Sequence, residues 1–385
     1  MRADWPTEYN PPNWERQIHM AVWDNFPADY RSAEVRAIHS AVKAGECVAI
    51  VGLSGAGKSN LLGYLAARQP VAGPRFVLVD GNRLSEPSTA GFLSLMSQAL
   101  EQTLPGPAEG AQSPDALSDL EAAVASRVGG GLCFLLDLSL LLDRDGRLLA
   151  GRGQGLWGNL RALRDRHKYA LTYVVATRHA LPSDNELAEL FFSHTMWLGP
   201  LADSDARWNL EQFALRAGRH WAAAEADAIL AAAGGYAALL RAVCEACAAG
   251  TAPDLEALSQ HPAVAARLDE FWRDRPEPAE LQAAGVDRIG LFMATRPPIF
   301  DTTRLTAKEH RLLQALQAQP GAVCDKDDLI RAVWPEDKVF ENGVRDDSLA
   351  QLVRRLREKI EPDAGHPRYI QTVPGRGYRL VVSTK

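Results

Sequence analysis

The chain has 385 residues, of which 46% are hydrophobic and 23% charged, and a formal net charge of −6 at pH 7. These proportions are ordinary for a globular protein, and the length predicts two or three domains. No apolar run reaches about 18 residues and the first residues contain no apolar core segment, so we expect neither a membrane span nor a signal peptide. Two of the five cysteines fall in predicted buried strands, which favours reduced thiols and a cytoplasmic protein.

Charge is distributed unevenly along the chain. Residues 302–385 carry 15 Lys or Arg and 12 Asp or Glu, whereas the preceding residues carry 27 and 36. A segment of net charge +3 therefore follows a body of net charge −9. This distribution is compatible with nucleic-acid contact through the C-terminal segment.

Residues 1–30 are rich in Pro and Trp, and we expect them to form an arm laid across a domain. Between residues 31 and 200, apolar strand-like runs alternate with helical segments. This alternation predicts an α/β domain with a parallel sheet and helices on both faces. The predicted strands are Cys47–Val51, Phe76–Asp80, Leu132–Asp137, Leu171–Ala176 and Thr195–Leu198.

The segment Gly52–Ser59 fits the P-loop pattern G-x-x-x-x-G-K-[ST] and lies between the first predicted strand and a predicted helix. Its glycines let backbone N–H groups approach phosphate oxygens, and the helix N-terminus adds partial positive charge. We expect Lys58 to reach the β- and γ-phosphates of ATP, and the Ser59 hydroxyl to bind Mg²⁺. The expected ATP- or ADP-binding residues of this loop are Gly52, Ser54, Gly55, Ala56, Gly57, Lys58, Ser59 and Asn60.

Two further predicted strands lead to candidate site residues. Asp137 ends a wholly apolar run, so we expect its carboxylate to lie beside the P-loop and hold Mg²⁺, directly or through water. The alternative for Asp137 is a helix N-cap. Leu138 stands where many such ATPases have an acid that orients the attacking water, so we expect slow hydrolysis. Arg178, after the fourth strand, either senses the γ-phosphate or is an ordinary surface arginine.

Residues 201–275 are helical and Ala-rich, and we expect them to form a helical lid in which Gly234-Gly235 separates two helices. The predicted lid helices are Trp208–Ala217, Ala222–Ala233 and Tyr236–Ala249.

The order of P-loop, Asp-ended strand, Thr-Arg-ended strand and helical lid resembles the STAND branch of AAA+-related ATPases, over roughly residues 25–250. The resemblance implies that the segment before the first strand, with Tyr30 and Arg31, cradles the base. Ala237 occupies the position where the family has a Pro that contacts adenine. Tyr236 is the residue that we expect to stack on adenine instead.

Residues 276–301 are expected to connect the lid to a last domain, 302–385. Thr306 and Glu309 form a capping box before an apolar helix face. Two further predicted helices and a β-hairpin with a basic tip follow, which together predict a winged helix whose third helix enters the DNA major groove. The predicted helices are Asp325–Trp334 and Asp346–Ile360, and the hairpin turns at Pro374–Gly377.

The sequence from Leu305 to Arg379 resembles the OmpR/PhoB-type DNA-binding domain, including the stretch Tyr-Ile-Gln-Thr-Val-Pro-Gly-Arg-Gly-Tyr-Arg at its end. The resemblance implies sequence-specific binding to double-stranded DNA. Some members have an arginine where this chain has Pro374, which leaves the minor-groove contact to Arg376. The implied DNA-contact residues on the third helix and the wing are Ser348, Gln351, Arg354, Arg355, Arg357, Thr372, Arg376 and Tyr378.

These features predict an ATP-switched transcription regulator whose partners are double-stranded DNA, a second copy of the chain after ATP binding, and a signalling protein. One alternative is an AAA+-type DNA-remodelling or initiator-like ATPase that assembles on DNA. Arg161, Arg164 and Arg166 are then either arginine fingers or a solvated helix face. Another alternative is an adaptor that uses nucleotide only to hold its fold. The sequence specifies no operator, target gene or inducing signal.

Overall fold

The structure is a computed structural model. It describes residues 23–84, 88–105, 115–143, 155–182, 188–191, 193–296, 304–319, 321–334, 346–361 and 363–381. The chain divides into two compact units, which meet in the sequence between Ile289 and Gly290. This division lies inside the connector expected at 276–301. Most of the arm expected at 1–30 lies outside the described residues.

The first unit contains a five-stranded parallel sheet with the strand order β2-β3-β4-β1-β5. It confirms all five predicted strands, and each end differs from its prediction by at most one residue. β1 lies between β4 and β5, with Val51 opposite Thr177, so the P-loop and the end of β4 meet at one edge. The strands are β1 (Val48–Val51), β2 (Arg75–Asp80), β3 (Leu132–Asp137), β4 (Leu171–Thr177) and β5 (Thr195–Trp197).

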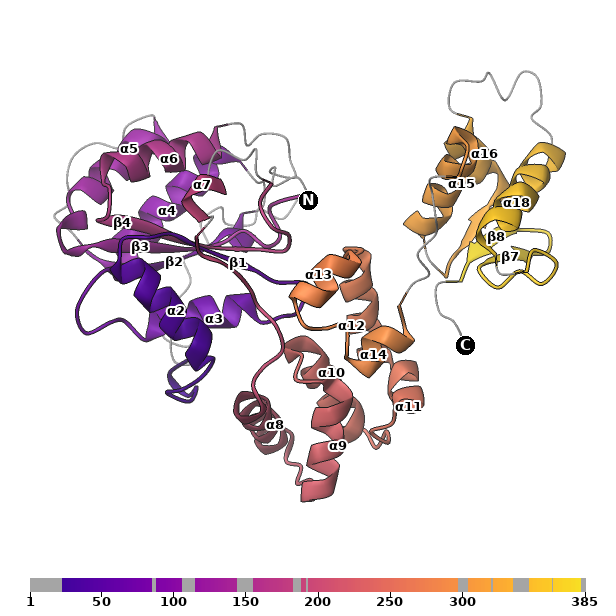
Figure 1. Ribbon diagram of the computed structural model, residues 1–385, viewed down its shortest axis with the longest axis horizontal. Helices are drawn as coiled ribbons and strands as arrows, with labels where there is room; N and C mark the ends of the chain where they lie inside the picture. Colours follow the sequence, from indigo (N-terminus) through magenta and orange to yellow (C-terminus); the bar gives the residue numbers. More distant parts are fainter. Residues whose placement is uncertain are drawn as a thin grey trace, which may run out of the picture. The chain divides into compact units, whose positions relative to one another are not determined.

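Helices cover both faces of this sheet, as expected for parallel strands that are buried along their length. Figure 1 shows α2 (Ser32–Lys43) and α3 (Lys58–Ala67) on one face, and α4 (Thr89–Thr103), α5 (Ala116–Ala125) and α6 (Leu156–Arg166) on the other. The short elements of this domain are η1 (Gly81–Arg83), η2 (Val128–Gly130) and α7 (Ala188–Phe191).

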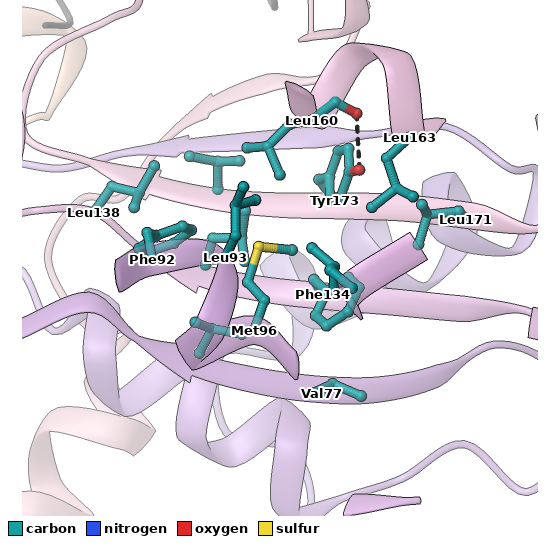
Figure 2. Packing of buried hydrophobic residues seen from close by; sticks show 14 of the residues in the cluster. Val77, Phe92, Leu93, Met96, Phe134, Leu138, Leu160, Leu163, Leu171 and Tyr173 are labelled. Atoms are coloured by element: carbon teal, nitrogen blue, oxygen red, sulfur yellow. Dashed lines mark hydrogen bonds between the residues drawn. The ribbon is translucent and has the colours of Figure 1, made fainter. Parts of the chain in front are cut away.

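The main core of the first unit lies between the sheet and the helices α4, α5 and α6. Phe92, Met96, Phe134 and Tyr173 are fully buried there, and they interdigitate with aliphatic side chains (Figure 2). The hydroxyl of Tyr173 donates to the carbonyl oxygen of Leu160 at 2.9 Å, so this phenol is buried without losing its hydrogen bond. A buried polar group left unpaired would cost about 1–3 kcal/mol.

A set of lid helices completes the first unit. Gly234 and Gly235 both have positive φ, +56° and +71°, and they end one lid helix and turn the chain into the next, as predicted. The last three helices were not predicted, although Asp254 and His261 cap two of them with their side chains, and the third lies in the segment expected to be a connector. The lid helices are α8 (Asp203–Ala217), α9 (Ala223–Ala233), α10 (Ala237–Ala248), α11 (Leu255–Gln260), α12 (Pro262–Arg273) and α13 (Pro278–Ala283).

The second unit contains the predicted winged helix. Its three main helices pack around buried leucines, and Thr306 and Glu309 form the expected capping box at the start of the first. Its hairpin gains a third antiparallel strand that the sequence analysis missed, in the order β6-β8-β7. The elements are α14 (Gly290–Ala294), α15 (Ala307–Ala318), β6 (Val323–Asp325), α16 (Lys326–Val333), α18 (Asp346–Ile360), β7 (Ile370–Val373) and β8 (Gly377–Leu380).

Among the described residues of both units, no helix combines the length and the apolar character that crossing a membrane requires.

Candidate functional site

The P-loop leaves β1 at Gly52, and its backbone is fixed between two strands and a helix. The Gly52 N–H donates to the Thr177 carbonyl at 3.0 Å, and α3 begins at Lys58. Gly55 and Gly57 have φ angles of +82° and +94°, a region that residues with a Cβ rarely adopt. At Gly55 a Cβ would also lie 2.5 Å from the Cβ of Ala238 in the lid. Both glycines are therefore required by the loop conformation.

Lys58 is buried beneath the loop, where its amine donates to the carbonyl oxygens of Gly52 and Leu53. Burial lowers the pKa of Lys58 to about 8, with Asp137 and Asp274 acting to raise it and Arg178 to lower it. Four charged groups thus interact at the carboxyl edge of the sheet. An anionic phosphate group beside Lys58 would favour its charged form.

Ser59 and Asp137 are in direct contact beside the P-loop. The Ser59 hydroxyl donates to Oδ2 of Asp137 at 2.6 Å, and Oδ1 of the same carboxylate accepts the Ser139 N–H at 3.1 Å. A hydroxyl and a carboxylate oxygen at the end of a P-loop are suitable Mg²⁺ ligands. Leu138 is fully buried in the main core, so the position after Asp137 supplies packing and no acid.

Arg178 lies at the end of β4, as predicted, and forms an ion pair with the lid. Its Nη1 lies 2.7 and 2.9 Å from the two carboxylate oxygens of Asp274, the residue after α12. The neighbouring His179 is bonded to Glu280 of α13 through Nδ1, at 2.8 Å. The tip of β4 is therefore held by two acids of the lid.

The first turn of α10 lies against the P-loop. The Tyr236 hydroxyl donates to the Ser54 carbonyl at 2.7 Å, and the Ala238 N–H donates to the Gly55 carbonyl at 3.0 Å. The Tyr236 ring is 1% exposed and packs edge-to-face on Phe271 of α12. Because this ring is buried while the lid contacts the P-loop, stacking on adenine would require the lid to move. The adenine contact stays a prediction.

Arg31 joins three parts of the first unit. It has a left-handed backbone, with φ 45°, and its guanidinium donates to the carbonyls of Ala56 in the P-loop and Gly199 before the lid, both at 3.0 Å. Its backbone N–H donates to the buried carboxylate of Asp205 in α8 at 2.9 Å. Tyr30 is also buried and packs on neighbouring aromatic rings. The structure thus brings Arg31 to the loop, and contact with a base stays a prediction.

Sequence reasoning missed the acidic residues that the lid contributes. Glu270 of α12 accepts a hydrogen bond from the Ser54 hydroxyl at 3.1 Å, and Asp274 pairs with Arg178. These two acids are four residues apart, so Glu270 on α12 and Asp274 at its C-terminal end lie on the same side of the helix. The four-residue spacing could have shown from the sequence that the two acids lie on the same side of a helix. It does not show which residues they bind.

In the second unit, most predicted DNA contacts are exposed. Arg354 is 82% exposed and forms a helix-surface pair with Glu358. The exposed residues are Ser348, Gln351, Arg354 and Arg355 on α18, and Thr372 and Arg376 on the hairpin.

Arg357 and Tyr378 differ from the other predicted contacts because they hold α18 to the hairpin. The Arg357 guanidinium donates to the Ile370 carbonyl at 2.7 and 3.0 Å and to the Thr372 hydroxyl at 2.9 Å. It also lies 6.0 Å from the centre of the Tyr378 ring, which is 7% exposed. These contacts give both residues a role in positioning the wing, and their contact with DNA stays a prediction.

Comparison with known families identifies the second unit. Residues 301–380 match the family model described as "Transcriptional regulatory protein, C terminal". These residues form an OmpR/PhoB-type DNA-binding domain.

Curated relatives match in the same part of the chain. The cholera toxin transcriptional activator of Vibrio cholerae is 40% identical over 78 residues, which are 20% of this chain and 26% of that protein. An uncharacterized transcriptional regulatory protein of Bacillus subtilis is 38% identical over 98 residues, which are 26% of this chain and 39% of that protein. The chain therefore spans well under half the length of these relatives.

Solved structures align over more of the chain but only distantly. The alignment with a Walker-type ATPase of Pyrococcus abyssi covers 91% of this chain and 93% of that protein, with a TM-score of 0.45 and 12% identity. The alignment with a structure of Drosophila ORC bound to DNA covers 88% of this chain and 88% of that chain, with a TM-score of 0.39 and 15% identity. Likenesses at this level carry no argument about function.

We predict that Tyr236→Phe loosens the P-loop. The buried Ser54 carbonyl loses its donor, which should lower the free energy of unfolding by about 1–2 kcal/mol and speed amide exchange in residues 52–59. Chemical denaturation and hydrogen exchange with mass spectrometry measure the two effects. Tyr173→Phe is the matched control, because it removes another buried hydroxyl–carbonyl bond and should leave P-loop exchange unchanged. P-loop exchange that stays at the wild-type rate in Tyr236→Phe would refute the contact.

We predict that Arg357 and Arg354 have separable roles. Arg357→Met should destabilise residues 346–381 by about 1–3 kcal/mol, because the Ile370 carbonyl loses its charged donor. Arg354→Met should leave stability unchanged and weaken DNA binding at fixed salt. Hydrogen exchange of the full chain and a DNA-binding titration measure these effects. A fully stable Arg357→Met variant would contradict the structural role.

Proposed function

We propose that this protein is a nucleotide-switched transcriptional regulator of the cytoplasm. ATP or ADP with Mg²⁺ would bind at the P-loop, and the winged helix would bind specific double-stranded DNA. The observation that carries the proposal is the Ser59–Asp137 contact beside a buried Lys58, in a chain that also contains an OmpR/PhoB-type domain. The sequence resemblance to STAND ATPases supports a switch, because that layout combines a P-loop with a lid.

The chain's own residues suit a nucleotide at this edge of the sheet. The P-loop residues from Gly52 to Asn60 would bind the phosphates through backbone N–H groups, and Ser59 and Asp137 would hold Mg²⁺. Bound Mg²⁺ would neutralise charge on the phosphates. A switch requires a nucleotide that binds the two states unequally. Lys58 and Arg178 are the cationic groups that could distinguish a triphosphate from a diphosphate.

Slow hydrolysis suits a switch better than a motor. The position after Asp137 is filled by the buried Leu138, so no carboxylate there orients water. The three arginines considered as fingers each have a hydrogen-bond partner in the first unit, which gives each of them a structural role there. Their partners are Glu189 for Arg161, the Gly45 carbonyl for Arg164 and Glu121 for Arg166.

DNA recognition would follow from the exposed face of α18. Gln351 can read adenine bidentately, and an arginine can read guanine. The remaining arginines, together with the wing residues, would contact phosphates and fix the position of the domain. Assembly of two copies after ATP binding, and contact with a signalling protein, complete the proposal.

We predict that Lys58→Ala abolishes ATP binding and makes DNA affinity of the full chain independent of nucleotide. The physical reason is that the amine on which phosphate binding depends is removed, while the DNA-binding unit keeps all its residues. Nucleotide titration and DNA titration at one salt concentration measure the two effects.

Lys43→Ala, which removes an exposed lysine at the end of α2, is the control and should behave as wild type. A Lys58→Ala protein whose DNA affinity still responds to ATP as the wild type does would refute the coupling.

A further inference from the structure

Two carboxylates of the lid bind Ser54 and Arg178, which we expect to face the end of a bound triphosphate. Asp274 binds Arg178 through both carboxylate oxygens, and Glu270 accepts the Ser54 hydroxyl bond. Both acids come from α12 or the residue that ends it. The contacts thus belong to one helix that reaches across to the P-loop domain.

Arg178 follows the strand end that lies next to the P-loop. It directly follows Thr177, whose carbonyl is bonded to the first P-loop residue, Gly52, at 3.0 Å. Arg178 and Asp274 both act on Lys58 electrostatically, in opposite directions. The side chains of Arg178 and Asp274 are 24% and 16% exposed, so their pairing takes place at a partly desolvated site. An ion pair in such a site is screened less than one at the surface.

A γ-phosphate and the Asp274 carboxylate are both negatively charged, and both would bind the Arg178 guanidinium. Each is an anion that a guanidinium binds through charge-assisted hydrogen bonds. Both Asp274 oxygens already use the same Arg178 nitrogen, Nη1. Like charges brought close together at such a site repel each other. ADP has no γ-phosphate and therefore leaves this pair intact.

We propose that Asp274 sets the chain's selectivity between ADP and ATP, by holding the arginine that a γ-phosphate would otherwise engage. The lid-closed arrangement with the Arg178–Asp274 pair then accepts ADP, whereas ATP binds at the expense of this pair. Only this difference between the two nucleotides can shift the lid. Glu270 adds a second contact between α12 and the P-loop, because one of its oxygens accepts from Ser54 while the other pairs with Arg267. The inference rests on the nucleotide binding proposed above.

A purely structural ion pair would behave differently. Removing it would loosen the lid and alter the binding of both nucleotides by a similar factor. A selectivity role alters the ratio of the two dissociation constants. The ratio is therefore the decisive quantity.

The test measures Mg²⁺-dependent binding of ADP and of a non-hydrolysable ATP analogue to the full chain by calorimetry. Asp274→Asn keeps the shape and removes the charge. It should tighten binding of the ATP analogue about tenfold relative to ADP, while ADP affinity changes by less than about twofold. Asp274→Glu restores the charge and should return the ratio toward wild type.

Asp227→Asn is the matched control. Asp227 forms a 2.7 Å pair with Arg207 on the exposed surface of the lid, so the same substitution there should leave the ratio unchanged. If wild type and Asp274→Asn bind both nucleotides with the same ratio, the inference is wrong and the nucleotide site stands. If wild type binds neither nucleotide, the proposed function fails as well.

A second measurement needs no variant. In the wild-type chain, the ATP analogue should speed amide exchange in α12, residues 262–273, relative to ADP, because it breaks the contacts that α12 makes through Glu270 and Asp274. Equal exchange of α12 in the two nucleotide states, at saturating concentrations, would overturn the proposal.

Discussion

The contact between the first turn of α10 and the P-loop is the constraint that places the lid at the edge of the sheet where the P-loop lies. The Ala238 N–H donates to the Gly55 carbonyl, and the Tyr236 hydroxyl donates to the Ser54 carbonyl. Ala238 lies so close to Gly55 that a residue with a Cβ would not fit there. This contact brings α12 over the same edge of the sheet. The acids of α12 then reach Ser54 and Arg178. A ligand that altered these contacts would change how the lid is held.

Much of this arrangement could be predicted from local sequence patterns. The five strands are apolar runs of strand length separated by helical segments. The P-loop pattern identifies Lys58 and Ser59, and the apolar run before Asp137 identifies that strand end. The winged helix also follows from local signals, the Thr306–Glu309 capping box and the apolar stripe of α18. Residues close in sequence share a helix face or a strand, and the ends of parallel strands lie at one edge of the sheet, so the sequence pattern already predicts which of them lie close together.

The contacts that could not be predicted join residues far apart in sequence. Asp274 meets Arg178 across 96 residues, and Tyr236 meets Ser54 across 182. The packing of the lid on the P-loop domain decides these pairs, and no local sequence pattern encodes that packing. The same limit explains why the sequence did not predict the hydrogen bond of Tyr236 to the P-loop or those of Arg357 to β7. An arginine on a helix face has the same sequence signature whether it binds a carbonyl or a phosphate.

In the proposed function, a nucleotide at the P-loop controls DNA binding by a separate unit of the same chain. The most direct measurement is the DNA affinity of the wild-type full chain at one salt concentration, with saturating ADP and Mg²⁺ and with a non-hydrolysable ATP analogue and Mg²⁺. The account predicts dissociation constants that differ by about fivefold or more. Equal affinities in the two nucleotide states, with both nucleotides shown to be bound, would contradict it.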